Sequence, residues 1–540
     1  MADGNTQTRV WDSRRQEKNR RLCNLRRNGK VLDTSEIIRA LETVVMPGDK
    51  VVIEGNNQKQ ADFLARSLCE VNPDHVHDLH MIIPSISLPE HLDIFEKGIA
   101  RKLDFSYSGT QILEIGAIHT YIELYARLYV DLIPNVVLIA GYKADRNGNL
   151  YTGPSTEDTP ALVEAAAFHD GIVIAQVNEI VENPQDLPRV DIPGSWVDAV
   201  VASDKPFFIE PLFTRDPRQI KNQHILMAMM AIKGIYARHA VQTLNHGIGF
   251  NTAAIELLLP TFGQSLGLKG KICQNWCLNP HPTLIPAIES GWVQSIHCFG
   301  GELGMEEYIA ARPDVFFTGP DGSMRSNRAF CQMAGQYAVD MFIGSTLQID
   351  SLGNSSTVTR GRLSGFGGAP NMGHDPHGRR HATKAWLDMI REPSPVARGH
   401  KLVVQMVETY QAKGKPTFVE NLEAVEVAKQ AHMPLAPVMI YGDDVTHIVT
   451  EEGIAYLYLA ETENERRQMI AAVAGISPLG IKADLKSVSK LRRDGKIAFP
   501  EDLAIRRTEA TRSLLAAKSI ADLVEWSGGL YNPPAKFRSW

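Results

Sequence analysis

The chain has 540 residues, of which 44% are hydrophobic and 22% charged, and its formal net charge at pH 7 is -6. This length exceeds one ordinary hydrophobic core, so two or three domains are expected. The acidic balance excludes the basic footprint that is typical of nucleic-acid-binding proteins. Apolar runs fall short of the roughly 18 residues of a membrane span, and residues 1–30 are too polar for a secretory signal. Six scattered cysteines suit a reducing compartment. We therefore expect a cytoplasmic enzyme or enzyme subunit.

The first half of the chain carries the pattern of an α/β protein, in which short apolar strands run into turns and then helices. Residues 51–54 predict a buried strand, 55–57 (Gly-Asn-Asn) a turn and 61–69 a helix. A second strand over 136–140 leads towards a turn at 145–149 (Asp-Arg-Asn-Gly-Asn). A helix is expected over 161–169 and a strand over 172–177.

The second half repeats this order. A strand over 240–244, a turn at 246–249 and a helix over 252–259 are followed by a strand over 346–349 and the turn 350–354 (Asp-Ser-Leu-Gly-Asn). Each Asp-x-x-Gly-Asn turn lies roughly a hundred residues beyond the glycine-bearing turn of its half. We interpret this as a tandem duplication, with residues 1–235 and 236–540 as the two domains. The tail is expected to be helical over 461–472 and 503–523.

The most informative segment for chemistry is 363–373, Leu-Ser-Gly-Phe-Gly-Gly-Ala-Pro-Asn-Met-Gly. Its glycines leave backbone N–H groups unshielded, so several amides can point at one developing oxyanion. A tight turn without chemistry is the alternative, and the polar residues of 371–380 favour the functional interpretation.

Weaker signals lie elsewhere in the second half. The turn around Gly247 and Gly249 lacks the third glycine of a dinucleotide fingerprint, which leaves a packing turn or a substrate-binding turn. Cys273, Cys277 and His281 lack the fuller ligand set of a zinc site, so no metal is expected. Residues 443–453 predict a strand bounded by acidic turns, with or without a role in a site.

Four segments, taken in order, resemble the CoA-transferase superfamily over about residues 45–460. They are 145–149, 173–179 (Val-Ile-Ala-Gln-Val-Asn-Glu), 364–368 (Ser-Gly-Phe-Gly-Gly) and 448–453 (Ile-Val-Thr-Glu-Glu-Gly). The opening 10–19 and the continuation 371–380 are similar to malonate decarboxylase α subunits in particular, with citrate lyase α subunits as the next relatives. The resemblance implies two tandem CoA-transferase-like open α/β domains with the active site between them.

The same resemblance implies a reaction: acetyl-S-carrier and malonate give malonyl-S-carrier and acetate. The implied partners are an acyl-carrier subunit and the decarboxylase subunits of the same complex, without nucleic acid or membrane. The chain itself would bind no cofactor and would act on the carrier's phosphoribosyl-dephospho-CoA arm. A CoA transferase or acyl-CoA hydrolase that uses free CoA, and a non-catalytic scaffold that holds the carrier, are the alternatives.

One departure from the superfamily concerns the nucleophile. Residues 271–282, which align with its glutamate segment, contain no carboxylate, and Glu289 and Glu302 lie in a different context. We therefore expect the malonate carboxylate to attack the thioester directly, with backbone amides stabilising the oxyanion.

The expected site combines these features. The oxyanion donors are assigned to the glycine-rich segment, at Gly365, Gly367, Gly368 and Ala369. Substrate and thioester binding is assigned to Gly247, Gly249, Phe250, Asn56, Asn57, Asn371, Arg325, Arg362, His374 and Glu452. Arginine is favoured for the distal malonate carboxylate because its guanidinium binds carboxylates with two hydrogen bonds. The basic opening from Arg9 to Lys30 is expected either to dock an acidic partner or to be a solvated helix.

Overall fold

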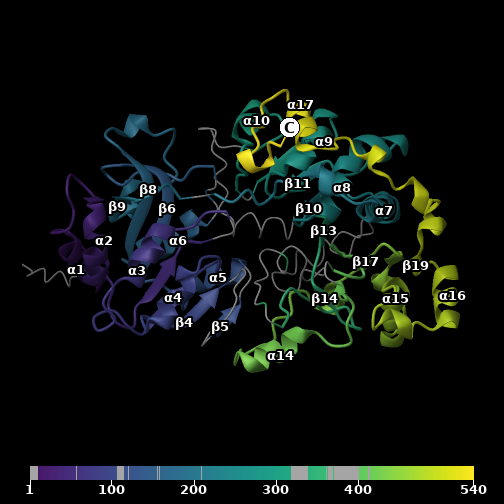
Figure 1. The fold of residues 1–540 in the computed structure, drawn as a ribbon, viewed down its shortest axis with the longest axis horizontal. Coiled ribbons are helices and arrows are strands. Elements are labelled where there is room, and N and C mark those ends of the chain that lie inside the picture. Colours follow the sequence, from purple (N-terminus) through teal and green to yellow (C-terminus); the bar gives the residue numbers. More distant parts are fainter. Residues whose placement is uncertain are drawn as a thin grey trace, which may run out of the picture. The chain divides into compact units, whose positions relative to one another are not determined.

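The computed structural model describes residues 10–55, 58–105, 115–118, 121–154, 156, 158–207, 209–298, 300–317, 339–360, 362, 369, 401–411 and 414–539. The chain forms two compact units, the first ending at Glu210 and the second comprising most of the chain from Pro211 on. In Figure 1 the first unit is coloured purple to blue and the second teal to yellow. Residues between Pro211 and the expected boundary at 235/236 include helix α7 (Asn222–Ala231), which packs in the core of the second unit.

The first unit is built on a nine-stranded sheet. Its strands are β1 (Val31–Leu32), β2 (Lys50–Ile53), β3 (Leu79–Ile82), β4 (Ala100–Phe105), β5 (Ile115–Ile118), β6 (Val136–Asp145), β7 (Leu150–Tyr151), β8 (Ile172–Val181) and β9 (Ala199–Ala202). Its helices are α1 (Val10–Leu22), α2 (Ile37–Val44), α3 (Asp62–Cys69), α4 (Glu90–Glu96), α5 (Tyr121–Leu128) and α6 (Thr159–Ala167). The first halves of the central strands are apolar and buried, at residues 51–53 of β2, 136–140 of β6 and 172–175 of β8, which is typical of parallel strands covered by helices on both faces.

The second unit contains an eight-stranded sheet and a two-stranded hairpin. The sheet is formed by β10 (Thr243–His246), β11 (Asn275–Cys277), β12 (Ser295–His297), β13 (Met341–Gly344), β16 (Leu402–Met406), β17 (His447–Val449), β18 (Ile454–Ala455) and β19 (Ile497–Ala498), and the hairpin by β14 (Gln348–Ile349) and β15 (Ser355–Ser356). Its further helices are α8 (Phe250–Leu258), α9 (Ile285–Glu289), α10 (Glu306–Ala311), α14 (Glu423–Gln430), α15 (Glu463–Val473), α16 (Leu485–Arg493) and α17 (Ile520–Trp526).

Six parallel strands follow the same order in the two sheets. In the first unit the order is β4-β3-β2-β6-β8-β9, and in the second it is β12-β11-β10-β13-β16-β17. The two halves therefore share one architecture, which confirms the predicted pair of α/β domains. They differ after the fourth strand of this order, because β6 runs unbroken to its turn whereas β13 stops and the chain enters the separate hairpin β14-β15.

The two Asp-x-x-Gly-Asn turns have the same internal hydrogen bonds. In the first unit Asp145 Oδ1 accepts the N–H groups of Asn147 and Asn149, each at 2.9 Å. In the second unit Asp350 Oδ1 accepts those of Leu352 at 2.9 Å and Asn354 at 3.0 Å. The glycines have positive φ angles of 87° and 93°, as this turn requires.

Each turn is also attached to a distant segment in the same way. The Oδ1 atom of Asn149 accepts the N–H of Gly194 at 2.8 Å, and that of Asn354 accepts the N–H of Gly442 at 2.8 Å. Gly194 and Gly442 each begin a short 3-10 helix, Gly194–Trp196 in one unit and Gly442–Asp444 in the other. The repeat thus extends beyond the local motif that first indicated it.

The tail departs from the sequence-based expectation. The segment 503–523 is not one helix: it forms short 3-10 turns followed by α17, because Arg506, Thr511 and Ser519 take extended conformations that interrupt helix growth. Helix α16 was not anticipated, and α15 was. Polar α16 is amphipathic, and its Val488 and Leu491 pack on a core cluster of the second unit.

The basic opening forms helix α1, and part of its charge is used inside the first unit. Lys18 Nζ lies 2.7 Å from Asp198 Oδ2, and Arg26 Nη2 lies 3.8 Å from Asp198 Oδ1. Arg20 and Arg27 remain 72% and 68% exposed. The helix is therefore neither fully solvated nor fully available as a docking surface.

Candidate functional site

The end of β10 passes into α8 through the turn Gly247-Ile248-Gly249. The N–H of Gly247 donates to Ile343 O in β13 at 2.7 Å, and the hydroxyl of Thr252 donates to Gly247 O at 2.7 Å. A Cβ atom at Gly247 would lie 3.0 Å from the Cα of Gly344, so the close approach of β13 accounts for this glycine. The turn is held firmly at the carboxyl edge of the sheet, where ligands bind in open α/β folds.

Gly249 has a different role, because its backbone is extended at φ 162° and any residue can adopt that conformation. A Cβ atom there would have its nearest contact at 4.0 Å, the N atom of Asn251. Packing therefore does not require this glycine. Its lack of a side chain leaves the first amides of α8 approachable, and such amides carry partial positive charge.

Two further side chains meet this turn and were missed by the sequence reasoning. His224 Nε2 lies 2.8 Å from Glu408 Oε1, and the His224 ring stacks on Phe250 with centroids 6.1 Å apart. His224 Nδ1 accepts the N–H of Lys221 at 3.1 Å, so the imidazole proton is on Nε2 and points at Glu408. Burial raises the pKa of Glu408, but hydrogen bonds from His224, the Glu408 backbone and Asn251, together with the charge of His224, outweigh burial and lower the pKa. An ionised carboxylate thus lies next to the α8 N-terminus.

A buried polar network supports the turn from below. Glu256 Oε1 in α8 accepts from His246 Nδ1 at 2.8 Å and from His281 Nδ1 at 2.9 Å, and Oε2 accepts from the Thr283 hydroxyl. Burial raises the pKa of Glu256, but the charge of His281 and these hydrogen bonds outweigh it and lower the pKa to about 2. The network ties β10, α8 and the segment after β11 together, so the turn has little freedom to move.

The two glutamates considered as nucleophiles have structural contacts. Glu302 is 1% exposed, and its Oε1 accepts the N–H of Thr214 at 2.9 Å and the Thr214 hydroxyl at 2.8 Å. Burial raises its pKa to about 7, although these hydrogen bonds oppose the shift. Glu289 accepts from Tyr308 OH at 2.6 Å and pairs with Arg312. These contacts favour a packing role for both.

Three other predicted site residues are described, and the contacts of these residues lie away from the Gly247 turn. Glu452 follows β17, three strands away from β10 in the sheet order, which is about 14 Å at normal strand spacing. Its carboxylate lies 3.4 Å from Arg507 Nη2. Arg362 is exposed and pairs with Thr359 through backbone hydrogen bonds of 2.9 and 3.1 Å. Ala369 is half-buried against a core cluster of the second unit.

The remaining predicted residues lie outside the described part of the chain. These are Gly365, Gly367, Gly368, Asn371, His374, Arg325, Asn56 and Asn57.

The strand end that flanks Asn56 and Asn57 is built from buried charges. Glu54 Oε1 lies 3.2 Å from Lys59 Nζ, and both side chains are fully buried. Thr159 links the pair by donating to Glu54 and accepting from Lys59 Nζ at 2.6 Å, while the N–H of Ala140 donates to Glu54 Oε2 at 2.8 Å. Burial raises the pKa of Glu54. These contacts fix the end of β2 inside the first unit.

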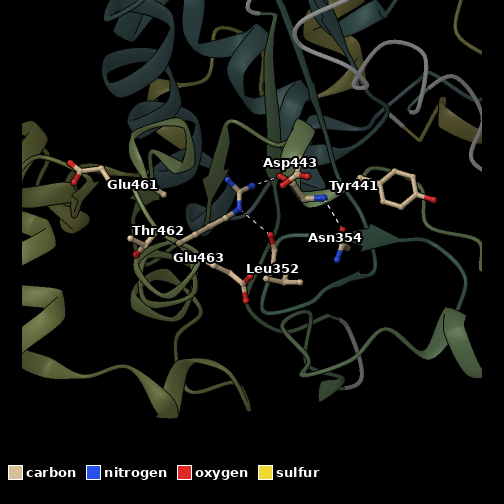
Figure 2. A pocket seen from close by; sticks show the side chains of 10 residues that line it. Leu352, Asn354, Tyr441, Asp443, Glu461, Thr462 and Glu463 are labelled. Atoms are coloured by element: carbon tan, nitrogen blue, oxygen red, sulfur yellow. Dashed lines mark hydrogen bonds between the residues drawn. The ribbon is translucent and has the colours of Figure 1, made fainter. Parts of the chain in front are cut away.

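A pocket of about 520 Å³ opens at the second Asp-x-x-Gly-Asn turn (Figure 2). It is lined by Leu352, Asn354, Tyr441, Gly442, Asp443, Ala460, Glu461, Thr462, Glu463 and Arg466. The guanidinium of Arg466 donates to Leu352 O at 3.0 Å, to Val445 O at 3.0 Å and to Gly442 O. Burial lowers the pKa of Arg466, and Asp443 opposes this. None of the predicted site residues that the structure describes lines this pocket, and Arg466 is occupied by carbonyl groups.

Two open, mainly parallel sheets of equal strand order define an α/β protein of the CoA-transferase-like fold. The α subunit of citrate lyase from Streptococcus mutans has this fold at a TM-score of 0.58 and 15% identity, covering 94% of this chain and 86% of that one. Within the described residues, no helix is both long and apolar enough to cross a bilayer.

The chain belongs to the malonate decarboxylase α-subunit family, whose model, "Malonate decarboxylase, alpha subunit, transporter", matches residues 10–540. It is 56% identical to an acetyl-S-ACP:malonate ACP transferase from Malonomonas rubra, over 98% of this chain and 99% of the relative. A Pseudomonas malonate decarboxylase hetero-tetramer, crystallised in complex with malonate, contains a chain that is 72% identical with a TM-score of 0.92, covering 98% of this chain and 99% of that one. The Acinetobacter baumannii α subunit is 68% identical with a TM-score of 0.92, covering 98% and 100%.

Proposed function

We propose that this chain is the acyl-carrier transferase of a malonate decarboxylase: it exchanges acetyl for malonyl on the carrier thiol and releases acetate. The observation that carries this proposal is the 56% identity to an acetyl-S-ACP:malonate ACP transferase over 98% of this chain and 99% of the relative. The crystal of a 72% identical relative's complex with malonate supports the choice of substrate.

The chemistry needs no activated side chain, because malonate already carries an ionised carboxylate near neutral pH. One malonate oxygen attacks the acetyl thioester carbon, and the resulting tetrahedral oxyanion collapses to acetic–malonic anhydride and the carrier thiolate. The thiolate then attacks the malonyl carbonyl of the anhydride, which forms malonyl-S-carrier and releases acetate. Atoms and charge balance without a proton donor.

The protein must align the two carboxyl groups, stabilise the oxyanion and exclude water. We assign the oxyanion donors to the amides of Gly365, Gly367, Gly368 and Ala369. A second set of donors is assigned to the turn from Gly247 to Phe250, at the amides that follow Gly247, because the Gly247 N–H already donates to Ile343 O. Support for the second set is the open approach at Gly249 and the rigid network under it. One well-aimed donor contributes about 3 kcal/mol to transition-state stabilisation.

Substrate binding is assigned to the remaining residues of the predicted set. Asn56 and Asn57 would contact the thioester arm beside the buried Glu54–Lys59 pair. The distal malonate carboxylate would bind to a cation among Arg325, Arg362 and His374, and of these Arg362 is exposed in the described part of the chain. Asn371 and Glu452 complete the set.

The proposed partners are the acyl-carrier subunit and the decarboxylase subunits, in line with the hetero-tetramer of the Pseudomonas relative. The chain would hold no cofactor of its own and would act on the carrier's phosphoribosyl-dephospho-CoA arm. Exposed Arg20 and Arg27 on the basic opening suit an acidic carrier. The few, scattered cysteines of the sequence suit a cytoplasmic location.

The decisive experiment incubates acetylated carrier with the chain and malonate and follows the carrier by mass spectrometry. Conversion to malonyl-carrier with release of acetate is expected. Thiol release without an acid acceptor would instead indicate a hydrolase, and turnover of acetyl-CoA in place of the carrier would indicate an ordinary CoA transferase.

Gly368→Val is expected to remove turnover in a folded protein. Hydroxylamine trapping of an acyl-glutamate at Glu289 or Glu302 would reject the direct attack.

A further inference from the structure

The link between α15 and α16 exposes three large aliphatic side chains within ten residues. Ile476, Ile481 and Leu485 are 80%, 73% and 79% exposed. Each is more exposed than a soluble protein surface usually tolerates in a cluster.

The backbone of this link is compact. A Cβ atom at Gly480 would lie 1.9 Å from the carbonyl oxygen of Gly475, so the residues next to Ile476 and Ile481 approach each other closely. The N–H of Ile481 donates to Ser477 O at 3.1 Å, which closes the turn that carries Ile476 and Ile481. Asp484, which caps α16, donates its N–H to Gln468 Oε1 of α15 at 2.8 Å, so the start of α16 with Leu485 is held against α15.

The outer face of α16 is basic. Lys486, Lys490 and Arg493 are spaced four and three residues apart, which puts them on one side of the helix, while Val488 and Leu491 face the core. All three are exposed, and among the described residues neither lysine has a carboxylate oxygen within 4.0 Å. This local basic stripe contrasts with the chain's net charge of -6.

We propose that the α15–α16 surface, formed by Ile476, Ile481, Leu485, Lys486, Lys490 and Arg493, binds a decarboxylase subunit of the complex through an apolar patch ringed by carboxylates. The inference goes beyond the transfer reaction and rests on the proposed membership in a multisubunit complex. A permanently bound subunit suits this surface better than the carrier, because aliphatic side chains this exposed need lasting cover and a carrier must dissociate.

Charge disfavours two other binding partners for this surface, a second copy of this chain and an anionic membrane. Two copies of this surface would bring lysines against lysines, which disfavours a symmetric contact between copies of the chain. An anionic membrane would meet the carboxylates of Glu420 and Asp484 next to the basic residues, where Glu420 pairs with Lys482. A mixed charged rim around an apolar centre is instead the composition of a protein interface.

The test uses the complete complex, obtained by producing the chain together with its carrier and decarboxylase subunits. Ile481→Asp and Lys490→Glu are the test variants. Their matched controls are Val130→Asp, which changes another aliphatic side chain that is 75% exposed, and Lys205→Glu, which changes an exposed lysine of the first unit. Native mass spectrometry measures subunit composition, and the isolated chain is assayed for exchange on free carrier.

We expect Ile481→Asp to weaken the binding of the decarboxylase subunit by about thirtyfold, and Lys490→Glu by about fivefold. Both variants and both controls should keep the exchange activity of the isolated chain. Full assembly by both test variants would overturn the proposal, as would loss of the carrier alone or equal loss in the controls. Flotation with vesicles of anionic phospholipid that depends on Lys490, with assembly intact, would assign the surface to a membrane and overturn it too.

Discussion

In each unit, the Asp-x-x-Gly-Asn turn and the 3-10 helix attached to it form one module. A cationic side chain donates to the carbonyl groups of this 3-10 helix in both modules, but it comes from a different part of the chain in each. In the first unit Lys30 Nζ donates to Gly194 O and Val197 O, both at 2.6 Å. In the second unit Arg466 donates to Gly442 O and, at 3.0 Å, to Val445 O. Lys30 precedes its turn and lies next to β1, whereas Arg466 follows its turn and comes from α15.

This difference shows what the duplicated fold demands and what it leaves free. The short 3-10 helix after each turn directs two carbonyl groups inward, and buried carbonyls need a donor. A lysine and an arginine from unrelated segments meet the same demand. The need for a hydrogen-bond donor to these carbonyl groups is thus a property of the repeated backbone. The side chain that supplies the donor is not part of the repeat.

The ends of the two equivalent strands differ more deeply. Glu54 N–H donates to Leu138 O at 2.8 Å, and Gly247 N–H donates to Ile343 O at 2.7 Å, so the two residues occupy the same ladder position. The first unit places a buried carboxylate there and pairs it with Lys59. The second places a glycine there and leaves the following turn open. We infer that the first unit uses this strand end for rigidity and the second for ligand approach.

The largest effect is expected from Lys59→Met, which leaves Glu54 buried without its cation. The free energy of unfolding should fall by about 4 kcal/mol at neutral pH. Burial raises the pKa of Glu54 in the folded state, so the stability that protonated Glu54 contributes is lost as pH rises. The loss of unfolding free energy in Lys59→Met should therefore be smaller at about pH 5 than at about pH 8. Denaturant unfolding at both pH values measures this. A Glu54→Gln/Lys59→Met variant that is no more stable than Lys59→Met would contradict the pairing.

Arg466→Met should lower the free energy of unfolding by about 3 kcal/mol, because several carbonyl groups lose a charged donor. Arg467→Met is the matched control: that side chain is 39% exposed and pairs with exposed Glu463, so a loss below about 1 kcal/mol is expected. Equal unfolding midpoints for the two variants would show that the carbonyl groups of Leu352, Gly442 and Val445 do not need Arg466 as a donor.

Gly249→Val should reduce acetyl–malonyl exchange about a hundredfold without lowering the unfolding midpoint, because the added side chain enters open space over the first amides of α8. Gly247→Val should instead lower the midpoint, since its Cβ lies 3.0 Å from Gly344 Cα. Steady-state exchange and thermal unfolding of both variants measure the contrast. Unchanged exchange by Gly249→Val would remove this turn from the site.

Lys30→Met should cost about 2 kcal/mol of unfolding free energy, less than Arg466→Met, because Lys30 makes two carbonyl hydrogen bonds from a half-buried position. Arg27→Met, at a side chain that is 68% exposed, serves as the control. Calorimetry of the whole chain measures both. A loss larger than that of Arg466→Met would reverse the proposed ranking of the two modules.

Much of the fold could be predicted from local signals. The apolar runs at 51–54, 136–140 and 172–177 became β2, β6 and β8, and the segment 252–259 falls within α8 and the turn that follows it. The Asp-x-x-Gly-Asn turns were predictable because their hydrogen bonds span four residues. The expected helix over 503–523 was wrong, since extended residues within it, such as Thr511 and Ser519, interrupt the helix despite a favourable composition.

The candidate site was only partly predictable. The turn at Gly247 was found from its glycines, whereas Glu408 and His224 were missed although Glu408 directly follows the segment 402–407, which is apolar except for Gln405. A polar residue just past a strand is a usable signal, but its partner is 184 residues away and comes from another element. Glu256 gave no signal, because a charged residue in a helix is normally on the surface.

The amino-acid sequence by itself determined the strand–turn–helix repeat, the glycine turns and the family, because these depend on neighbouring residues and on motif order. The tertiary structure alone decided which charges are buried and paired: Lys59 with Glu54, Glu256 with two histidines, and Lys30 and Arg466 in equivalent cages. The physical reason is that burial and pairing arise from segments that are distant in the sequence, such as Lys30 and Gly194, which are 164 residues apart.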